Sequence, residues 1–225
     1  MVGSVSTPPT PIVPLPRQPL DFCGPQDAPE AAARRWAEAR RWYENELGWA
    51  MVPGPVGQPP RLLTGVRFDV LDVPVEAGAG ALRHLAPGSP VALCGDRMRL
   101  LVAAGSAEEL PGLLDWLEWS VLALDLRVLG AGGLIEAPAP PGRCPRDGAG
   151  CVEGAAVWLR PPEPGCEVEA SLPALSALGG AGRVGSAPDL VRLVDTVAAR
   201  CHRIRLRRAC AGPSAGRRNQ PLAFS

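Results

Sequence analysis

Apolar and polar side chains alternate most regularly over residues 66–76, Val-Arg-Phe-Asp-Val-Leu-Asp-Val-Pro-Val-Glu. Alternation with a period of two predicts a β-strand, with Phe68, Val70 and Asp72 on one face and Asp69 on the other. A carboxylate at the end of an apolar strand is costly unless it is solvated, paired with a cation or bound to a metal. An equally supported alternative is that Asp72 caps a following helix, because Asp before Val-Pro-Val-Glu is typical of a helix start.

The rest of the pattern places helices and hairpins in separate blocks. Helices are predicted over residues 27–47, 76–85, 106–117 and 186–202, and strands over residues 49–53, 90–94, 98–103, 123–129, 134–137 and 155–159. Ser106 and Glu109 match a capping box at the start of one helix. Because the elements do not alternate as in a parallel sheet, the predicted fold class is α+β. It has two layers, with helices on a mixed or antiparallel sheet.

Residues 27–203 are expected to form one domain between two disordered ends. Residues 1–26 are rich in proline and have little apolar periodicity, which predicts a disordered leader. Residues 204–225 are expected to form a basic, disordered tail, because the chain after Asp195 has seven arginines and no acidic residue. Such a tail could contact phosphate groups, although a solvated end is the commoner outcome.

The composition indicates a soluble protein but does not indicate a binding partner. All 23 basic residues are arginine and they balance 23 acidic residues, so the net charge does not point to nucleic acid or to an anionic membrane. No apolar run approaches the ~20 residues of a membrane span, which predicts a soluble, cytoplasmic protein with no membrane partner. Seven cysteines without a CxxC pair argue against a disulfide framework and against a regular zinc site.

A second isolated carboxylate, Asp125, lies in the apolar segment 122–128, Leu-Ala-Leu-Asp-Leu-Arg-Val. Two aspartates on central strands of one sheet suggest a shared divalent-metal site, because enzymes of phosphoryl transfer hold metal ions between carboxylates. The glycine-rich turn at residues 130–133 does not match G-x-G-x-x-G and opens no helix, so a dinucleotide site is not expected.

Two tryptophans lie at the end of the third predicted helix. Trp116 and Trp119 are close in sequence to Leu113 and Leu117, and all four are expected to pack in the core. Exposed tryptophans would instead favour an interaction face for a protein partner.

Four segments carry a further pattern. Residues 48–53 are Gly-Trp-Ala-Met-Val-Pro, residues 63–73 are Leu-Thr-Gly-Val-Arg-Phe-Asp-Val-Leu-Asp-Val, residues 125–138 contain Asp-Leu-Arg and then Gly-Gly-Leu-Ile-Glu-Ala-Pro, and residues 157–162 contain Val-Trp and Pro-Pro. In this order and spacing they resemble the N-terminal domain of bifunctional DNA primase/polymerases, in particular its actinobacterial branch. The resemblance runs from about residue 36 to residue 172 and implies a primase-polymerase-like fold with an RRM-like core.

The resemblance also implies template-directed nucleotidyl transfer in DNA replication, with Mg²⁺ or Mn²⁺ as cofactor. Asp72 matches the first carboxylate of the first catalytic motif and Asp125 matches the third motif, so these two are the predicted catalytic residues and metal ligands. The second carboxylate of the first motif falls on Pro74, which cannot bind metal. Glu76 is the predicted substitute as a metal ligand, whereas Asp69 would lie on the opposite face of the strand.

The family's histidine, which contacts the incoming triphosphate, falls on Arg99. A guanidinium can hold phosphate as a permanently charged fork, so Arg99 and Arg127 are the predicted phosphate-binding residues. The only histidines, His84 and His202, fit no motif position and are expected at the surface.

Three hypotheses follow from these residues. In the preferred one, the chain is a primase/polymerase-like domain that binds nucleotides or DNA and has lost or vestigial catalysis, because a missing metal-bridging carboxylate costs several kcal/mol of transition-state stabilisation. In the second, Glu76 completes an active DNA primase/polymerase. In the third, the chain is a non-enzymatic scaffold for a protein partner, and both aspartates are caps or solvated residues.

Overall fold

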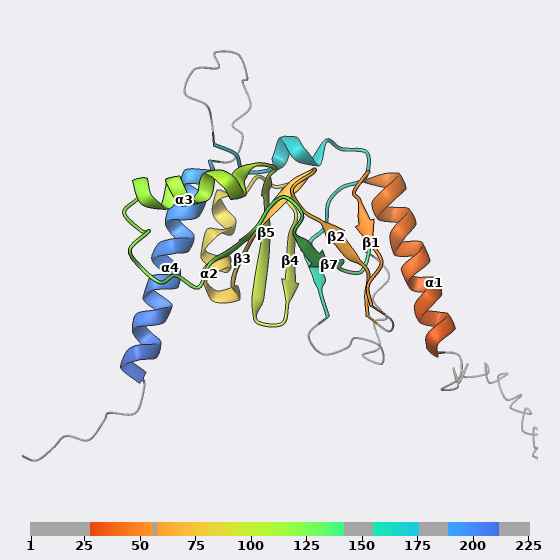
Figure 1. The fold of residues 1–225 in the computed structure, drawn as a ribbon, viewed down its shortest axis with the longest axis horizontal. Helices are drawn as coiled ribbons and strands as arrows, with labels where there is room; N and C mark the ends of the chain where they lie inside the picture. Colours follow the sequence, from red (N-terminus) through yellow and green to blue (C-terminus); the bar gives the residue numbers. More distant parts are fainter. Residues whose placement is uncertain (1–27, 56–57, 142–154, 176–188, 212–225) are drawn as a thin grey trace, which may run out of the picture.

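A computed structural model describes residues 28–55, 58–141, 155–175 and 189–211, with side chains from residue 32 onward. The chain forms an α+β fold with two antiparallel sheets and covering helices (Figure 1), which confirms the predicted class at this level. The elements are α1 (Ala28–Arg41), the π-helical turn η1 (Trp42–Glu46), β1 (Met51–Val52), β2 (Arg61–Leu63), β3 (Phe68–Pro74), α2 (Val75–Ala81), the 3₁₀ turn η2 (Leu82–His84), β4 (Val91–Cys94), β5 (Arg97–Ala103), α3 (Ser106–Trp116), β6 (Arg127–Leu129), β7 (Leu134–Glu136), β8 (Val157–Arg160), the 3₁₀ turn η3 (Val168–Ser171) and α4 (Leu190–Ala211).

The larger sheet has the strand order β6-β3-β5-β4-β8, and the smaller sheet has the order β1-β2-β7. Every strand pair in both sheets is antiparallel. The segment from β3 to β6 follows a β-α-β-β-α-β order in which the third strand lies between the first and the second, and the fourth lies beside the first. This is the split β-α-β topology. Strand β8 extends the sheet beyond β4.

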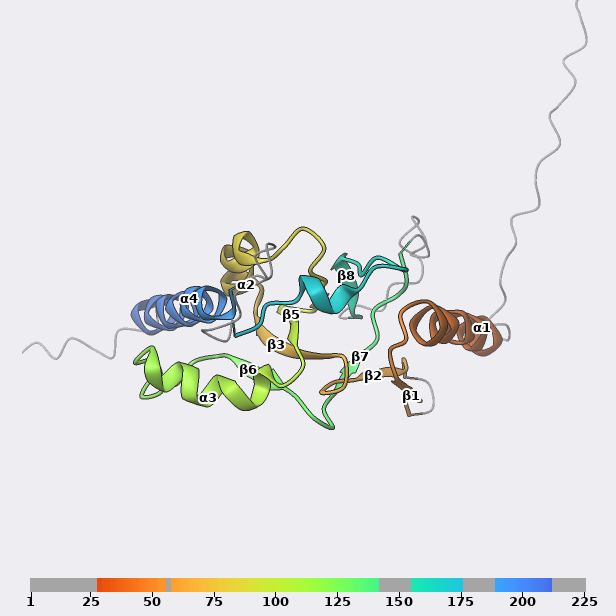
Figure 2. The same cartoon turned by 90° about the horizontal axis from the view of Figure 1, so that it is seen from above.

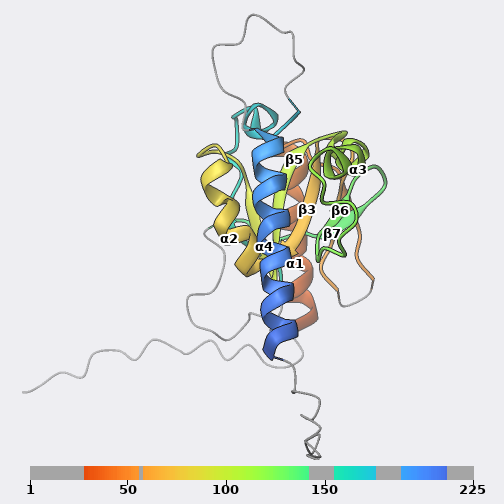
Figure 3. The same ribbon diagram turned by 90° about the vertical axis from the view of Figure 1, so that its left-hand side faces the viewer.

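Helices α2, α3 and α4 cover one face of the larger sheet (Figures 2 and 3). On this face, Leu71 of β3 and Leu100 of β5 are fully buried against Leu110 of α3 and Val194 of α4. Complete burial of such a side chain contributes about 1.5–3 kcal/mol. The helix-covered face therefore forms the main core, and it leaves the opposite face for the smaller sheet and for the polar residues described below.

The opposite face of β3 changes character along the strand. Phe68 and Val70 are buried in a second apolar cluster, which includes Trp49 and Tyr43 and lies against the smaller sheet. Asp72 follows on the same face, beyond the last residue that β3 contributes to this cluster. As predicted, Phe68, Val70 and Asp72 share a face, and the strand presents a carboxylate where the apolar cluster ends.

A tight crossing joins the two sheets where the chain passes from β6 to β7. Thr64, directly after β2, donates its hydroxyl proton to the carbonyl of Gly130 over 2.6 Å and its backbone N–H to the carbonyl of Gly133 over 2.9 Å. Neither glycine has room for a side chain. A Cβ on Gly130 would lie 2.5 Å from the Cβ of Ala107, and a Cβ on Gly133 would lie 2.4 Å from Thr64 Oγ1.

Three of the differences between the predicted elements and the structure concern the tail, Asp125 and the start of α3. Helix α4 continues to Ala211 with Ile204 buried, so residues 204–211 are helical and do not belong to a disordered tail. Strand β6 begins at Arg127, so Asp125 precedes the strand. The N-cap of α3 is Gly105, which makes no side-chain cap bond, so the predicted capping box does not form. The predicted leader, the predicted helix start at residues 186–188 and residues 212–225 lie outside the described ranges.

The predicted core position of Trp116 is wrong, because its side chain is 73 % exposed. Leu113 is buried as predicted. Trp119 is half-buried, and its indole N–H donates to the Asp195 carboxylate of α4 over 2.9 Å. None of the helices in the described part of the chain is both long enough and apolar enough to span a membrane.

Candidate functional site

Asp72 is held by arginines from the neighbouring strand β5. It faces Arg99 in the β3–β5 register, and its side chain is only 11 % exposed. Arg97 Nε donates to Asp72 Oδ1 in a close contact, and Arg99 Nε donates to Asp72 Oδ2 over 3.4 Å. The alternative that Asp72 caps a helix is wrong, because the N-cap of α2 is Pro74 and no side chain caps this end.

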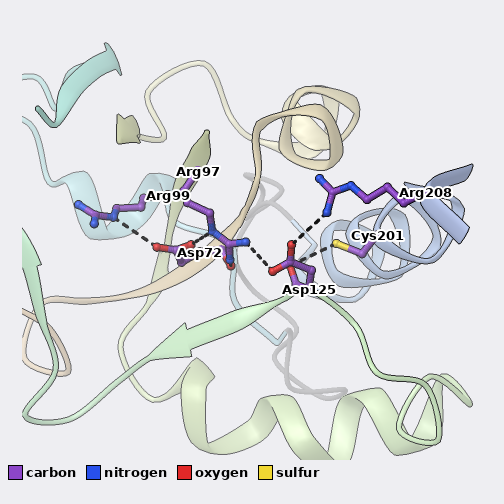
Figure 4. A network of polar contacts seen from close by, with 6 residues as sticks. All are labelled: Asp72, Arg97, Arg99, Asp125, Cys201 and Arg208. Carbon is purple, nitrogen blue, oxygen red and sulfur yellow. Dashed lines mark hydrogen bonds and ion pairs between the residues drawn. The ribbon is translucent and has the colours of Figure 1, made fainter. Parts of the chain in front are cut away.

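One guanidinium joins the two predicted catalytic aspartates (Figure 4). Arg97 donates from Nη1 to Asp125 Oδ1 over 2.6 Å and from Nη2 to the backbone carbonyl of Asp72 over 2.7 Å, in addition to its contact with the Asp72 carboxylate. Burial alone would lower the pKa of Arg97, but these hydrogen bonds and the two negative charges outweigh burial and raise the pKa above its usual value. Arg97 therefore keeps a positive charge between the two carboxylates.

Asp125 lies in the loop before β6 and is more exposed than Asp72, at 44 %. Helix α4 contacts it twice. Arg208 Nη1 lies 3.9 Å from Asp125 Oδ2, and the Cys201 thiol donates to the Asp125 backbone carbonyl over 3.6 Å. Burial, followed by the nearby Asp125 charge, raises the pKa of the Cys201 thiol to about 11, so this thiol stays protonated at neutral pH. The C-terminal half of α4 thus anchors the loop that carries Asp125.

The two predicted phosphate-binding arginines flank Asp72. Arg99 on β5 and Arg127 on β6 both face Asp72 in their strand registers, so the three side chains share one face of the sheet. Arg99 Nη1 also donates to the backbone carbonyl of Glu136 on β7 over 3.5 Å and so reaches the smaller sheet. Both contacts of Arg99 are long for hydrogen bonds, and Arg127 is exposed. The structure therefore brings the predicted arginines together with Asp72.

Glu76 is paired with an arginine that does not contact the two aspartates. Its carboxylate, in the first turn of α2, pairs with Arg207 of α4. Asp69 lies on the helix-covered face, as predicted, where its Oδ2 accepts a hydrogen bond from the Ala107 N–H of α3 over 2.8 Å. Burial raises the pKa of Asp69, and this hydrogen bond offsets the increase only in part. Neither carboxylate supplies the one that Pro74 lacks.

These residues do not fit the divalent metal that the resemblance implies. Mg²⁺ and Mn²⁺ bind to carboxylate oxygens, but all four carboxylate oxygens of the two aspartates face a guanidinium. Arg97 contacts one oxygen of each aspartate, and Arg99 and Arg208 approach the remaining two. Within the described ranges, no group of three or more His, Cys, Asp or Glu side chains is arranged to hold a metal ion.

The two histidines pack against α4 and the segment that follows α3. His84 Nε2 lies 3.0 Å from Thr196 Oγ1, and the ring of His202 lies near that of Trp119, with centroids 6.2 Å apart. Both histidines are half-buried, so they lie only partly at the surface where they were expected. Their contacts are structural, and neither imidazole is part of the arginine–aspartate network.

Arg97 is the central residue of the network, and the predicted hairpin does not reveal it. That hairpin places residues 95–97 in the turn, whereas β5 begins at Arg97. Alternation along β5 puts Arg97 and Arg99 on the same face of the sheet, and both residues pair with positions of β3. This alternation is the sequence signal that identifies Arg97 as a partner of Asp72.

Comparisons with known proteins give no assignment. No family model, no curated protein and no solved structure matches the chain. The resemblance to primase/polymerases therefore stays a prediction, and a function has to be argued from the geometry of the network.

Proposed function

We propose that this chain is a primase/polymerase-like domain that binds the phosphate groups of nucleotides or DNA and has lost nucleotidyl transfer. The split β-α-β unit supports the RRM-like core that the resemblance implies. Asp72 lies on the first strand of this unit and Asp125 lies in the loop shortly before its last strand, near the place where the resemblance implies a carboxylate.

The observation that carries the proposal is the position of the Arg97 guanidinium between Asp72 and Asp125. A two-metal polymerase site needs its carboxylates to bridge two cations about 3.5–4 Å apart. Carboxylates that are neutralised by an arginine cannot stabilise the charge that develops during phosphoryl transfer through metal ions. Nucleotidyl transfer is therefore not expected, while the phosphate-binding arginines remain.

The network has an excess of positive charge. Arg97, Arg99 and Arg208 contact the two aspartates, and exposed Arg127 lies in register beside Asp72, which gives four positive charges against two negative ones. An excess of this sign attracts anions rather than cations. Guanidinium groups also match the geometry of phosphate, because they donate two parallel hydrogen bonds.

The alternatives have weaker support. An active polymerase that uses Glu76 as a metal ligand would have to break the Glu76–Arg207 ion pair. A scaffold that binds only a protein partner is favoured by one observation, the 73 % exposure of Trp116. That alternative leaves the excess of arginine in the network without a role.

Binding can be measured by fluorescence anisotropy in EDTA, with a labelled single-stranded oligonucleotide, a duplex of the same sequence and a labelled deoxynucleoside triphosphate. Arg99→Ala and Arg127→Ala should each weaken binding and reduce the slope of log K against log salt by about one. Arg192→Ala is a matched control, because Arg192 is exposed near the other end of α4 and pairs with Asp189. It should leave binding unchanged.

Three results would overturn the proposal. The first is the absence of binding for all three ligands. The second is a loss of binding in Arg192→Ala equal to that in Arg99→Ala and Arg127→Ala. The third is primer extension with Mn²⁺ that disappears in the Asp72→Ala, Asp125→Ala double variant, because this would establish an active polymerase.

A further inference from the structure

Three oxygen atoms converge on the Arg97 guanidinium. They are one carboxylate oxygen from each of Asp72 and Asp125 and the backbone carbonyl oxygen of Asp72. Carboxylate and carbonyl oxygens are the ligands that Mg²⁺, Mn²⁺ and Ca²⁺ prefer. A guanidinium is a planar cation whose donors point outward in several directions, so it can satisfy the same oxygen atoms through hydrogen bonds.

The outer carboxylate oxygens also lie near positive charges. Arg99 Nε is 3.4 Å from Asp72 Oδ2, and Arg208 Nη1 is 3.9 Å from Asp125 Oδ2. A divalent ion that competed with Arg97 would have to displace a guanidinium that is only 16 % exposed and would then be repelled by Arg99 and Arg208. The arrangement stabilises the internal cation and disfavours an external one.

We infer that Arg97 is a built-in cation that takes the place of a divalent metal between Asp72 and Asp125, so that the natural chain binds no Mg²⁺ or Mn²⁺ there. This positive charge belongs to a side chain of β5, so it is present at every metal concentration. The inference concerns the metal alone and stands whether or not phosphate binds. Its consequence for Arg99 and Arg127, which rests on the proposed function, is that phosphate binding needs no metal.

Removal of the guanidinium tests the inference. In Arg97→Ala the three oxygen atoms lose their cation, and one Mn²⁺ per chain should bind with a Kd of about 10⁻⁴–10⁻³ M, by analogy with weak Ca²⁺ sites made of oxygen ligands. Binding is measured as the loss of the electron paramagnetic resonance signal of free Mn²⁺. Arg97→Gln keeps a polar side chain at the start of β5 and replaces the alanine variant if that variant does not fold.

Matched variants separate this effect from a general change of charge. Arg99→Ala removes an arginine from the same strand that also contacts Asp72, but it leaves Arg97 in place. The natural chain and Arg99→Ala should bind Mn²⁺ at least about tenfold more weakly than Arg97→Ala. Adding Asp125→Asn to Arg97→Ala should abolish the gain. Mn²⁺ should also raise the Tm of Arg97→Ala and leave that of the natural chain unchanged, because a ligand stabilises only the state that binds it.

Three results would overturn the inference. One is Mn²⁺ binding to the natural chain that is lost in Asp125→Asn, which would mean that the oxygen atoms accept a metal despite Arg97. Another is that Arg97→Ala and Arg97→Gln, both folded by circular dichroism, bind no Mn²⁺. The last is Mn²⁺ binding to Arg97→Ala that survives Asp125→Asn. The Mn²⁺ titrations contain no nucleotide or DNA, so this inference and the phosphate binding of the proposed function can fail separately.

Discussion

Asp72 and Asp125 should contribute unequally to stability, although the sequence predicted a catalytic role for both. We expect Asp72→Ala to lower the free energy of unfolding by about 2–3 kcal/mol and Asp125→Ala to lower it by less than about 1 kcal/mol. The difference follows from burial, because the Asp72 side chain is 11 % exposed and the Asp125 side chain is 44 % exposed.

The magnitude for Asp72 starts from the cost of removing one partner of a buried ion pair, about 3–5 kcal/mol, because the other charge is left uncompensated. Asp72→Ala would leave Arg97 and Arg99 in this position, at 16 % and 14 % exposure. The expected cost of Asp72→Ala is smaller than this, because Arg97 retains its hydrogen bonds to Asp125 and to the backbone carbonyl of residue 72. Asp125→Ala leaves Arg208, which is 66 % exposed and can be solvated, while Arg97 keeps Asp72.

Urea unfolding at pH 7, followed by circular dichroism, measures both costs. Asp115→Ala is a control in which an exposed aspartate outside the network loses its bond to Ser120, with an expected change within about 0.5 kcal/mol. A cost of Asp72→Ala below about 1 kcal/mol, or equal to that of Asp125→Ala, would refute the reasoning. It would mean that solvent satisfies the arginines as well as Asp72 does.

Two further predictions concern buried polar groups outside the network. Burial raises the pKa of Asp69 above 3.8, so its contribution to stability is largest at low pH, where the carboxyl is protonated, and is lost as the pH rises through the raised pKa. The stability of Asp69→Asn relative to the natural chain should therefore increase between about pH 4 and pH 7 in urea unfolding; a constant difference would contradict this. Tyr43→Phe removes a 2.7 Å bond to the Pro138 carbonyl and the acceptor of the Trp158 N–H, which should cost about 1–3 kcal/mol. An unchanged free energy of unfolding in urea would mean that water takes over the hydrogen bonds of the phenol.

Local patterns predicted most of the elements, because the period of apolar positions reflects which face of a strand or helix is buried. The alternation at residues 66–76 predicted β3 and the face of Asp72. Such patterns do not report contacts between distant segments. Ser106 matches a capping box, yet a distant residue caps the N-terminal turn of α3. The Asp69 carboxylate accepts a hydrogen bond from the backbone N–H of Ala107, 38 residues further along the chain. Gly105 leads into this turn at φ 92°.

The candidate site was predicted only in part, for a similar reason. Arg97 and Asp125 are 28 residues apart in the sequence, and only the tertiary fold brings them together. With arginine as the only basic residue type, each arginine is also a weak signal by itself. The basic stretch after residue 203 likewise did not distinguish a disordered tail from a helix, and in the structure Arg207 and Arg208 lie on α4 and pair with acidic side chains.

The crossing formed by Thr64, Gly130 and Gly133 determines how the proposed phosphate site would meet a ligand. Arg127 lies on β6, just before the crossing, and Arg99 reaches across to β7, just after it. A Cβ on either glycine would overlap a neighbouring atom, and Thr64 bonds to the carbonyls of both, so the crossing is closely packed. We expect the backbone segments that carry the two arginines to need little further ordering when a ligand binds. The remaining ordering cost of binding then lies with the two arginine side chains and with the ligand, and it is largest for a flexible strand.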